Sequence, residues 1–249
     1  MITVEICITG IESALAAQAG GANRVELCEN LADGGTTPSL GMMALVRENL
    51  SIDVNVMIRP RGGDFCYSAA EFEMMKKDIA VAKEVGVNGI VLGILNPNGT
   101  VDKERCRELI ELARPLSVTC HRAFDMTRDP IEAIDDLLEL GVDRLLTSGL
   151  EQRAPEGAEI IRQLQERAGD RIAIMAGSGV NHNNAIALIE ETGVREIHVS
   201  SSVKAFVRGR MMYENPRVAM GDDDSVSEYA VFQVSPPRVE ALVDLVKDY

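Results

Sequence analysis

The sequence has little from which to build an aromatic core: it contains no tryptophan, and aromatic residues make up only 4% of its 249 residues. Hydrophobic residues still make up 46% of the chain, so the core must consist mainly of Val, Ile, Leu, Ala and Met. Aliphatic cores of this kind are typical of parallel strands that are buried on both faces. The length is compatible with one α/β domain that has a large core.

Long hydrophobic runs are absent as well. No apolar stretch approaches the roughly 18 residues of a membrane-spanning helix, and the first residues lead directly into a predicted strand without the basic and apolar regions of a secretory signal. We therefore expect a cytoplasmic protein without a membrane partner. The cysteines are odd in number and not closely paired, so we expect free thiols in a reducing compartment; they are Cys7, Cys28, Cys66, Cys106 and Cys120.

Positive charge is scarce. The chain has 25 Lys and Arg against 39 Asp and Glu, a net charge of -14, and such a field repels phosphate backbones. Nucleic acid is therefore not an expected partner. A small anionic ligand stays possible because the charge of a pocket is local, and Arg59 and Arg61 lie close together in the sequence. We interpret the acidic run at 222–224 as a solvated surface rather than a metal site.

A unit of glycine, small apolar residue, two polar positions and apolar strand occurs four times, beginning at Gly21, Gly86, Gly141 and Gly193. Glycine at this place fits the left-handed conformation that ends many helices. Further strands are predicted near 3–8, 53–58, 116–120 and 172–176. Eight alternations of strand and helix predict a TIM (β/α)8 barrel that forms a single domain over residues 1–249, with a doubly wound open sheet as the alternative.

Several helix starts and two irregular segments can also be read from the sequence. Ser68 with Glu71 predicts a capping box, and Asp129 and Ser235, each followed by proline, predict N-caps. We expect an irregular loop at 29–39, after the second strand, and a long irregular segment at 201–234, after the eighth. Loops of this length commonly form a lid, a binding loop or an interface.

Polar residues at alternate positions of the strands indicate which side chains point into the barrel. Because unpaired buried charge is strongly disfavoured, we expect Glu5 and Glu26 to lie near Arg59 in one network. The inward residues nearest the carboxyl ends of the strands would form a pocket, unless the network is purely structural. The inward set comprises Glu5, Cys7, Thr9, Glu26, Cys28, Asn55, Met57, Arg59, Thr119, His121, His198 and Ser200.

The stretch 118–125 begins as an apolar strand and then presents His121, Arg122 and Asp125 within five positions. His121 has inward parity and is the candidate general acid or base; an ordinary turn with a satisfied histidine is the alternative. Cys120 has outward parity and should pack against helices. Arg122 shares that parity, so it can join a pocket only if the chain has already turned.

Small residues end the seventh strand and follow the eighth. Gly177, Ser178 and Gly179 precede a helix that we expect to open at Asn181, and Ser200 follows strand eight. Backbone amides and a helix N-terminus of this kind favour an anion, including phosphate. A tight turn without a ligand would produce the same sequence.

Several long motifs, at residues 26–28, 34–39, 57–65, 121–125, 147–149 and 175–180, resemble the CutC family over essentially the whole chain. The resemblance implies a cytoplasmic TIM barrel that forms a homo-oligomer, with a dimer favoured, and that is linked by name to copper homeostasis. Cys7 and Cys28 match the positions at which copper(I) binding is expected in relatives. Thiolates suit this soft ion, although cysteine is also a common small core residue.

Three functional hypotheses therefore stay open. The first is a copper(I)-binding protein with Cys7 and Cys28 as ligands. The second is a barrel enzyme for a small anionic or phosphorylated metabolite, in which His121 exchanges protons and Arg59 and Arg61 hold the anion. The third is a partner-binding protein that keeps a pocket without turnover. In the enzyme, Asp125, Glu26 and Glu5 would assist catalysis, and Asp64, Ser148, Gly177, Ser178, Gly179 and Ser200 would contact the ligand.

Overall fold

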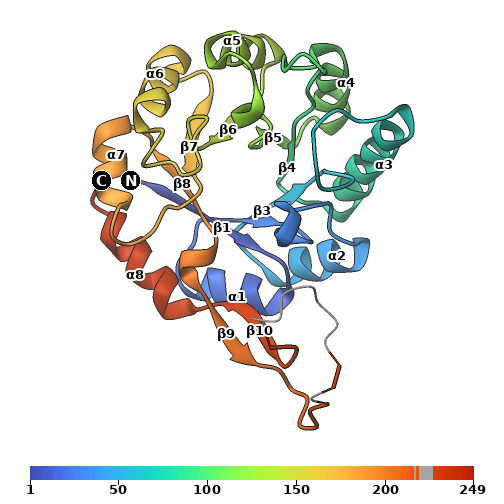
Figure 1. Ribbon diagram of the computed structural model, residues 1–249, viewed down its shortest axis with the longest axis vertical. Coiled ribbons are helices and arrows are strands. Elements are labelled where there is room, and N and C mark those ends of the chain that lie inside the picture. The colour runs from blue at the N-terminus through green and yellow to red at the C-terminus, as the bar shows by residue number, and fades with distance from the viewer. Residues whose placement is uncertain (216, 219–226) are drawn as a thin grey trace.

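The computed structural model describes residues 1–215, 217–218 and 227–249, and it contains a closed barrel of eight parallel strands with helices around it (Figure 1). The strands pair in chain order and β8 closes on β1. The predicted TIM barrel is therefore confirmed, and the open sheet is excluded. The strands are β1 (Thr3–Ile8), β2 (Arg24–Leu27), β3 (Asp53–Met57), β4 (Gly89–Leu92), β5 (Ser117–Cys120), β6 (Arg144–Thr147), β7 (Ala173–Gly177) and β8 (Glu196–Val199).

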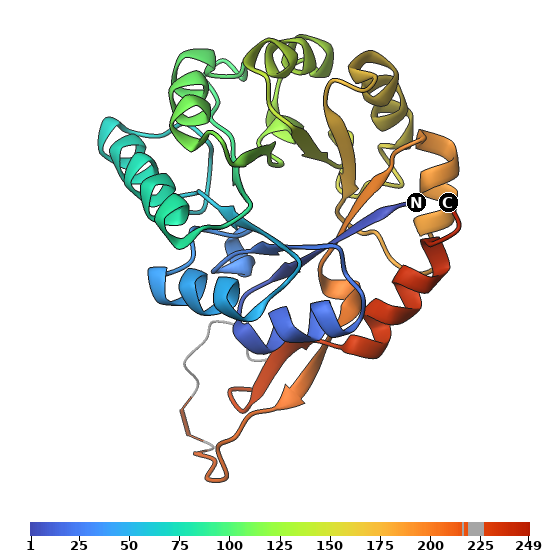
Figure 2. The same ribbon diagram turned by 180° about the vertical axis from the view of Figure 1, so that it is seen from behind.

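Helices cover the outside of the barrel in the order of the strands, as Figure 2 shows from the opposite side. The capping box of Ser68 and Glu71 is present, and Asp129 accepts hydrogen bonds at the start of its helix. Ser235 occupies its N-cap without a side-chain hydrogen bond. The helices are α1 (Ile11–Ala19), α2 (Leu40–Asn49), α3 (Ala69–Val85), α4 (Lys103–Ala113), α5 (Pro130–Leu140), α6 (Ala158–Ala168), α7 (Ala185–Thr192) and α8 (Pro236–Val246).

The repeated glycines end helices as predicted. Gly86, Gly141 and Gly193 are the C-caps of α3, α5 and α7, and all three are left-handed, with φ between 70° and 79°. The first unit differs by one residue, because Gly20 caps α1 and the left-handed Gly21 follows it. These short turns bring the chain from each helix directly into the next strand, which is why the repeat marked four strands correctly.

The main hydrophobic core lies between the strands and the helices, and it is aliphatic as the composition required. Cys120 belongs to this core and packs beside Cys106 of α4 and Leu137 of α5, which confirms its outward parity. A second, small apolar cluster lies inside the barrel and consists of Cys7, Cys28, Met57 and Val91. Apart from this cluster, Leu146 and Met175, the inward side chains are mainly polar, so the chemistry lies inside the barrel and most of the packing lies outside it.

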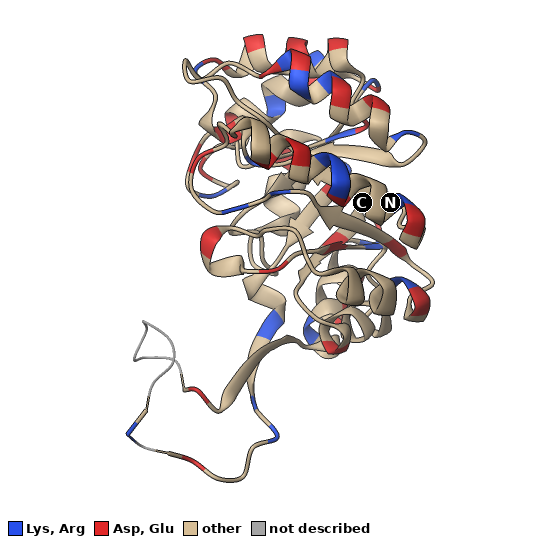
Figure 3. Cartoon of the chain, turned by 90° about the vertical axis from the view of Figure 1, so that its right-hand side faces the viewer, with Lys and Arg blue, Asp and Glu red and all other residues tan. Residues whose placement is uncertain are grey.

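The segment after β8 is more regular than we expected. It contains β9 (Lys204–Arg208) and β10 (Ala230–Val234), which pair antiparallel, with Phe206 opposite Phe232. We call residues 204–215 and 227–234 the arm; it projects from the side of the barrel (Figure 3). Its base is fixed to the barrel, because the Val234 amide donates to the Ser13 hydroxyl of α1 at 3.2 Å. The acidic run at 222–224 lies outside the described residues.

Charged residues lie mainly on the outer helices and loops in the same view (Figure 3). None of the helices that the structure describes is long and apolar enough to cross a membrane. The two ends of the described chain lie side by side, with the start of β1 next to the end of α8 (Figure 1, Figure 2).

Candidate functional site

Paired charges fill the amino end of the barrel interior. Arg24 begins β2 and lies 2.5 Å from both Glu5 of β1 and Glu196 of β8, and Arg144 of β6 lies 2.5 Å from the same Glu196. Arg24 and Glu5 are buried, and a buried charge is tolerated when it has a hydrogen-bonded partner of opposite sign. The network closes this end of the barrel and leaves the carboxyl ends of the strands for a ligand.

Arg59 is not the partner that we expected for Glu5 and Glu26. Its guanidinium instead donates to the carbonyl oxygens of Asp33, at 2.6 Å, and of Gly35 and Gly63, both at 2.9 Å. The reason is register: Arg24 lies level with Glu5 on the neighbouring strand, whereas Arg59 lies beyond the end of β3. Parity alone could not distinguish these two arginines.

His198 of β8 links the charged network to the part of the barrel interior that lies toward the carboxyl ends of the strands. Its Nδ1 lies 2.8 Å from Glu5 Oε1, and its Nε2 lies 3.7 Å from Glu26 Oε2. Burial alone would lower the pKa of His198, but Glu26, Cys7 and Glu5 together raise it well above its usual value. Burial likewise opposes ionisation of Glu5, but Arg24 and His198 outweigh it and hold the Glu5 pKa at about 2. The inner side of the site therefore holds an ionised His–Glu pair.

Two thiols lie next to the His198–Glu5 pair, toward the carboxyl ends of the strands. Cys7 Sγ and Cys28 Sγ are 4.0 Å apart, and Cys28 Sγ is 3.4 Å from Glu26 Oε2. Both thiols are buried. The hydrogen bond that Cys7 shares with Cys28 and the nearby His198 lower the pKa of Cys7 despite its burial, whereas the same hydrogen bond and burial raise the pKa of Cys28. Burial raises the pKa of Glu26 to about 8. The pair thus favours one thiolate, on Cys7.

These residues fit a soft metal ion. The sulfur of Cys7, a ring nitrogen of His198 and a carboxylate oxygen of Glu26 all lie within 4.8 Å of one another, and the Cys28 sulfur adjoins Cys7. A metal about 2.3 Å from each sulfur, the length of a zinc–thiolate bond, fits between sulfurs that are 4.0 Å apart. Glu5 binds Nδ1 of His198 and leaves Nε2 for a metal, as carboxylates commonly do for metal-bound histidines.

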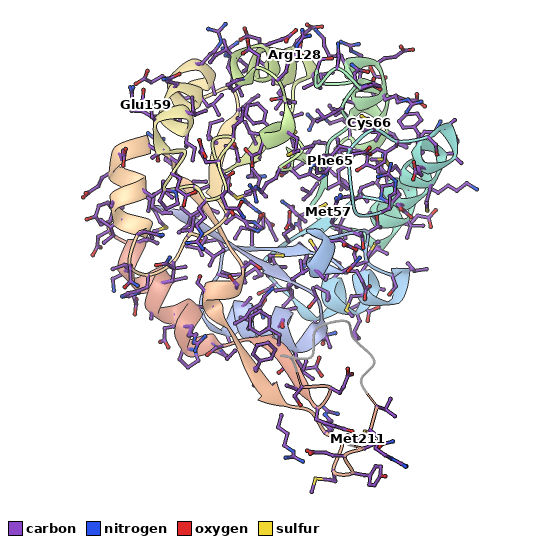
Figure 4. The ribbon with its side chains drawn as sticks, in the orientation of Figure 1. Met57, Phe65, Cys66, Arg128, Glu159 and Met211 are labelled. Carbon is purple, nitrogen blue, oxygen red and sulfur yellow. The ribbon has the colours of Figure 1, made fainter. Side chains whose placement is uncertain are left out.

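A cavity of about 460 Å³ opens at the carboxyl ends of the strands. Figure 4 shows Met57 and Phe65, which line it, over the interior of the barrel. Its volume lies within the range of about 300 to 1,000 Å³ that is usual for small-molecule sites. Of the two thiols, only Cys7 lines the wall. Other lining residues are Glu26, Arg59, His121, Arg122, Asp125, Ser178, Gly179, His198 and Ser200.

His121 follows β5 and is buried against this cavity, with 3% of its surface exposed. Burial, and secondly the charge of Arg59, lower its pKa to about 3. Its Nδ1 accepts a hydrogen bond of 3.2 Å from the Ala123 amide, so the neutral ring carries its proton on Nε2. This arrangement suits the donation of a hydrogen bond better than the exchange of protons near neutral pH, which the enzyme hypothesis required.

Asp125 holds a loop and an arginine in place. Its carboxylate accepts from Thr147 Oγ1 at 2.5 Å, from the Ser148 hydroxyl at 2.9 Å and from Arg122 Nε at 2.7 Å. Arg122 also donates to the Ser148 hydroxyl at 2.8 Å. The chain has therefore turned by residue 122, and Arg122 does join the cavity wall. Asp125 has no hydrogen bond to His121 among the described residues. Ser148 is buried behind the cavity wall.

Arg61 and Asp64 lie away from the cavity wall. The Arg61 guanidinium lies 2.6 Å from Glu71 of α3 and 3.1 Å from Asp64. It also packs on the Tyr67 ring, with 5.2 Å between Arg61 Cζ and the ring centroid. These contacts fix the loop after β3, and they leave Arg59 as the arginine of this loop that faces the cavity.

The small residues after β7 and β8 lie where we expected, but their hydroxyls are engaged internally. Ser178, left-handed with φ of 78°, donates to the Gln152 carbonyl at 2.8 Å. The hydroxyl of Ser200 accepts from the Lys204 ammonium at 3.2 Å. The helix that we expected at Asn181 begins only at Ala185. The cavity therefore has small residues on this side without the preformed helix N-terminus that we predicted.

Gly177 has a steric role beside the site. A Cβ atom there would lie 2.4 Å from Leu146 Cδ1 and 3.1 Å from His198 Cβ. Glycine therefore lets the side chains of β6 and β8 meet inside the barrel. Gly179 lines the cavity and is also left-handed, with φ of 72°.

Sequence reasoning missed three site residues. His198 was identified as inward but not as a site residue. Its inward direction, shared with Glu5, was the signal that could have placed it in the site. Arg24 shares the parity of Glu26, and the same rule would have found it. Lys204 is buried, and its charge lowers the pKa of Cys7 after larger contributions from Cys28 and His198. It follows the end of β8, and no strand pattern indicated it.

Comparisons with known proteins agree on one family. The sequence model of the CutC family matches residues 2–203, which ends just before β9. The chain is 45% identical to the mouse copper homeostasis protein cutC homolog, and the alignment covers 98% of this chain and 89% of that protein. It is 46% identical to a CutC family protein of Parabacteroides distasonis, over 96% of this chain and 98% of that protein.

Solved structures give the same result. A CutC protein from Streptococcus agalactiae superposes with a TM-score of 0.77 at 38% identity, over 80% of this chain and 98% of that chain. Phosphoribosylanthranilate isomerase from Thermotoga maritima superposes over all of both chains with a TM-score of 0.59, at 17% identity. The second likeness reflects the barrel fold alone.

Proposed function

Because this chain belongs to the CutC family of copper homeostasis proteins, we propose that it binds copper(I) through the thiolates of Cys7 and Cys28. The observation that carries this proposal is the 4.0 Å separation of the two sulfurs inside the barrel. Copper(I) favours thiolate ligands, and imidazole is also a suitable ligand for copper. His198 is the third candidate ligand because its ring adjoins Cys7, and its Nε2 would release its proton when the metal binds.

The surroundings of the two sulfurs support their use as ligands. A thiol must lose its proton to bind a metal, and the lowered pKa of Cys7 reduces the cost of that step. The proton of Cys28 points toward Glu26, whose carboxylate accepts the hydrogen bond at 3.4 Å. Cys7 lines the cavity, so an ion that enters from the mouth of the barrel meets this sulfur first.

The remaining cysteines provide matched controls. Cys106 is buried like the proposed ligands, but its thiol donates to the Ile94 carbonyl on the helix side of the barrel wall. Cys66 is half-buried in the loop after β3. Neither thiol belongs to the cluster inside the barrel, so neither should contribute to copper binding.

Anaerobic titration with copper(I) against a chromogenic chelator tests the proposal. We expect one copper(I) per chain in the parent and in Cys106→Ser. Cys7→Ser and Cys28→Ser should each weaken binding by at least about 100-fold, the upper end of the effect of losing one supporting residue at a metal site. A Cys7→Ser, Cys28→Ser double variant that binds copper(I) as tightly as the parent would contradict the proposal.

We also propose a cytoplasmic homo-oligomer, with a dimer favoured. Free thiols support a reducing location. Large apolar side chains that are exposed on the arm support self-association, since exposed apolar patches commonly mark interfaces; they include Phe206, Met211, Met212 and Tyr213, and Figure 4 shows Met211 far from the barrel. Light scattering after size-exclusion chromatography measures the state directly, and a monomer at micromolar concentration would contradict this part of the proposal.

A further inference from the structure

Unpartnered polar atoms gather at the cavity. In the part of the chain that the structure describes, the buried side-chain atoms without a hydrogen-bond partner are Glu26 Oε1, Arg59 Nε, Tyr67 Oη and His121 Nε2. Three of these four residues line the same cavity, and Tyr67 is the exception. Folded proteins leave few buried polar groups without partners. Their concentration here points to a ligand that is bound by this wall.

Arg59 carries the clearest part of this signal. It is only 4% exposed, yet no carboxylate among the described residues lies within ion-pair distance of it. The other arginines that face the barrel interior, Arg24 and Arg144, each have a carboxylate 2.5 Å away. The uncharged phenol of Tyr67 lies nearby but cannot neutralise a guanidinium. Burial of an uncompensated charge is costly, so an anionic ligand would relieve this cost.

The donors of Arg59 are only partly used. A guanidinium has five N–H groups, and three of those on Arg59 donate to the carbonyls of Asp33, Gly35 and Gly63. This leaves the Nε–H without an acceptor among the described residues. The carbonyls fix the orientation of the group, and a carboxylate is one of the anionic acceptors that a guanidinium binds strongly.

The carboxylates on the wall do not compete for Arg59. Asp125 already accepts from Arg122, with 2.7 Å between Oδ2 and Nε. The Asp33 carboxylate accepts from the Asn30 amide at 2.6 Å and lies in an exposed turn. The positive charge of Arg59 is therefore available to a ligand.

His121 supplies a second donor beside Arg59. Both flank the Phe65 ring: Arg59 Cζ lies 4.9 Å from its centroid, and the His121 ring centroid lies 5.1 Å from it. The neutral His121 ring has its Nδ1 occupied by the Ala123 amide, so Nε2–H is the group without a partner. A neutral donor next to a fixed cation suits a negatively charged oxygen.

We infer that this cavity binds a small hydroxycarboxylate, whose carboxylate accepts hydrogen bonds from Arg59 and His121 and whose hydroxyl donates to Glu26. Oε1 of Glu26 is the carboxyl oxygen among these four unpartnered atoms, and a carboxyl group keeps the capacity to accept a hydrogen bond from a hydroxyl in either protonation state. A cavity of about 460 Å³ readily holds a molecule of two to six carbons. This ligand is distinct from copper(I), because its charged group contacts neither thiol.

Calorimetric titration of the copper-free protein with glycolate, lactate and malate, and separately with inorganic phosphate, tests the inference. We expect saturable binding of at least one hydroxycarboxylate. His121→Phe and Arg59→Met should each weaken it by about 10- to 100-fold, since a hydrogen bond to a charged group is commonly worth that factor. His121→Gln keeps a donor amide and should retain most of the affinity, and the exposed Arg128→Met should retain all of it.

The outcomes separate this inference from the copper proposal. The Cys7→Ser, Cys28→Ser double variant should lose copper(I) but keep hydroxycarboxylate binding. If Arg59→Met does not fold, NMR of the ¹⁵N-histidine-labelled parent replaces it, because the Nε2–H resonance of His121 should shift as the ligand saturates. Absence of saturable binding by all three acids, binding of phosphate alone, or an affinity that is indifferent to His121→Phe would overturn the inference.

Discussion

The histidine at the mouth of the barrel should make stability depend on pH in a way that can be calculated. In the unfolded chain His121 has a pKa near 6.5, whereas burial and the charge of Arg59 lower it to about 3 in the folded protein. Below pH 6.5 the unfolded chain therefore binds a proton that the folded chain does not. The folded state must lose stability relative to the unfolded state as the pH falls.

The size of this loss in unfolding free energy requires only that the pKa of His121 in the folded protein lie well below 5. Each pH unit in this range costs up to about 1.4 kcal/mol for one such group, so the fall from pH 7 to pH 5 costs about 2 kcal/mol. His198 and Glu26, whose folded pKa values are raised, change stability in the opposite direction over the same range. The His121 contribution must therefore be measured as a difference between parent and variant.

Urea denaturation of the parent and of His121→Gln at several pH values between 7 and 5 measures that difference. The variant should gain about 2 kcal/mol in unfolding free energy relative to the parent as the pH falls, because glutamine does not titrate. His182→Gln is the matched control, because His182 is exposed, and its difference from the parent should stay small. A parent-to-variant difference for His121 that does not change with pH would refute a neutral, buried His121.

Two further predictions concern the support of the site. Arg24→Met should cost about 3 to 5 kcal/mol of unfolding free energy in urea, since it leaves buried carboxylates without their partner, whereas the exposed Arg128→Met should cost less than about 1 kcal/mol. Gly177→Ala should cost about 1 to 3 kcal/mol, because its Cβ would lie 2.4 Å from Leu146 Cδ1. Gly41→Ala, in α2 with nothing within 4 Å of the added Cβ, should be neutral or stabilising, and equal effects of the two glycine changes would contradict the steric argument.

The fold was predictable from local signals because each one reports on a few adjacent residues. Glycines such as Gly86 and Gly141 mark helix ends because the left-handed turn there favours glycine. Alternating polar residues mark strands because successive side chains of a strand point to opposite faces. Parity also placed Cys7 beside Cys28 and Cys120 outside the barrel. The inward or outward direction of a side chain follows from the two-residue repeat of its own strand, so it can be predicted without knowing which strands are its neighbours.

The charge pairing was not predictable because it depends on register. Glu5 pairs with Arg24 because the two residues lie level on adjacent strands. The alternation of inward and outward side chains does not say how far along the barrel axis a residue lies. The state of His121 depends on the Ala123 amide and on burial, which appear only when the chain turns after β5. Arg61 was expected at the ligand, but its guanidinium binds Glu71 of a helix that begins several residues later.

We propose that copper(I) is bound between Cys7 and Cys28, and anomalous diffraction at the copper edge would locate the ion. Crystals loaded anaerobically with copper(I) should give one anomalous peak per chain within bonding distance of both sulfurs, with His198 as the only further protein ligand. A copper peak away from these sulfurs, or loaded crystals with no peak inside the barrel, would contradict the claim.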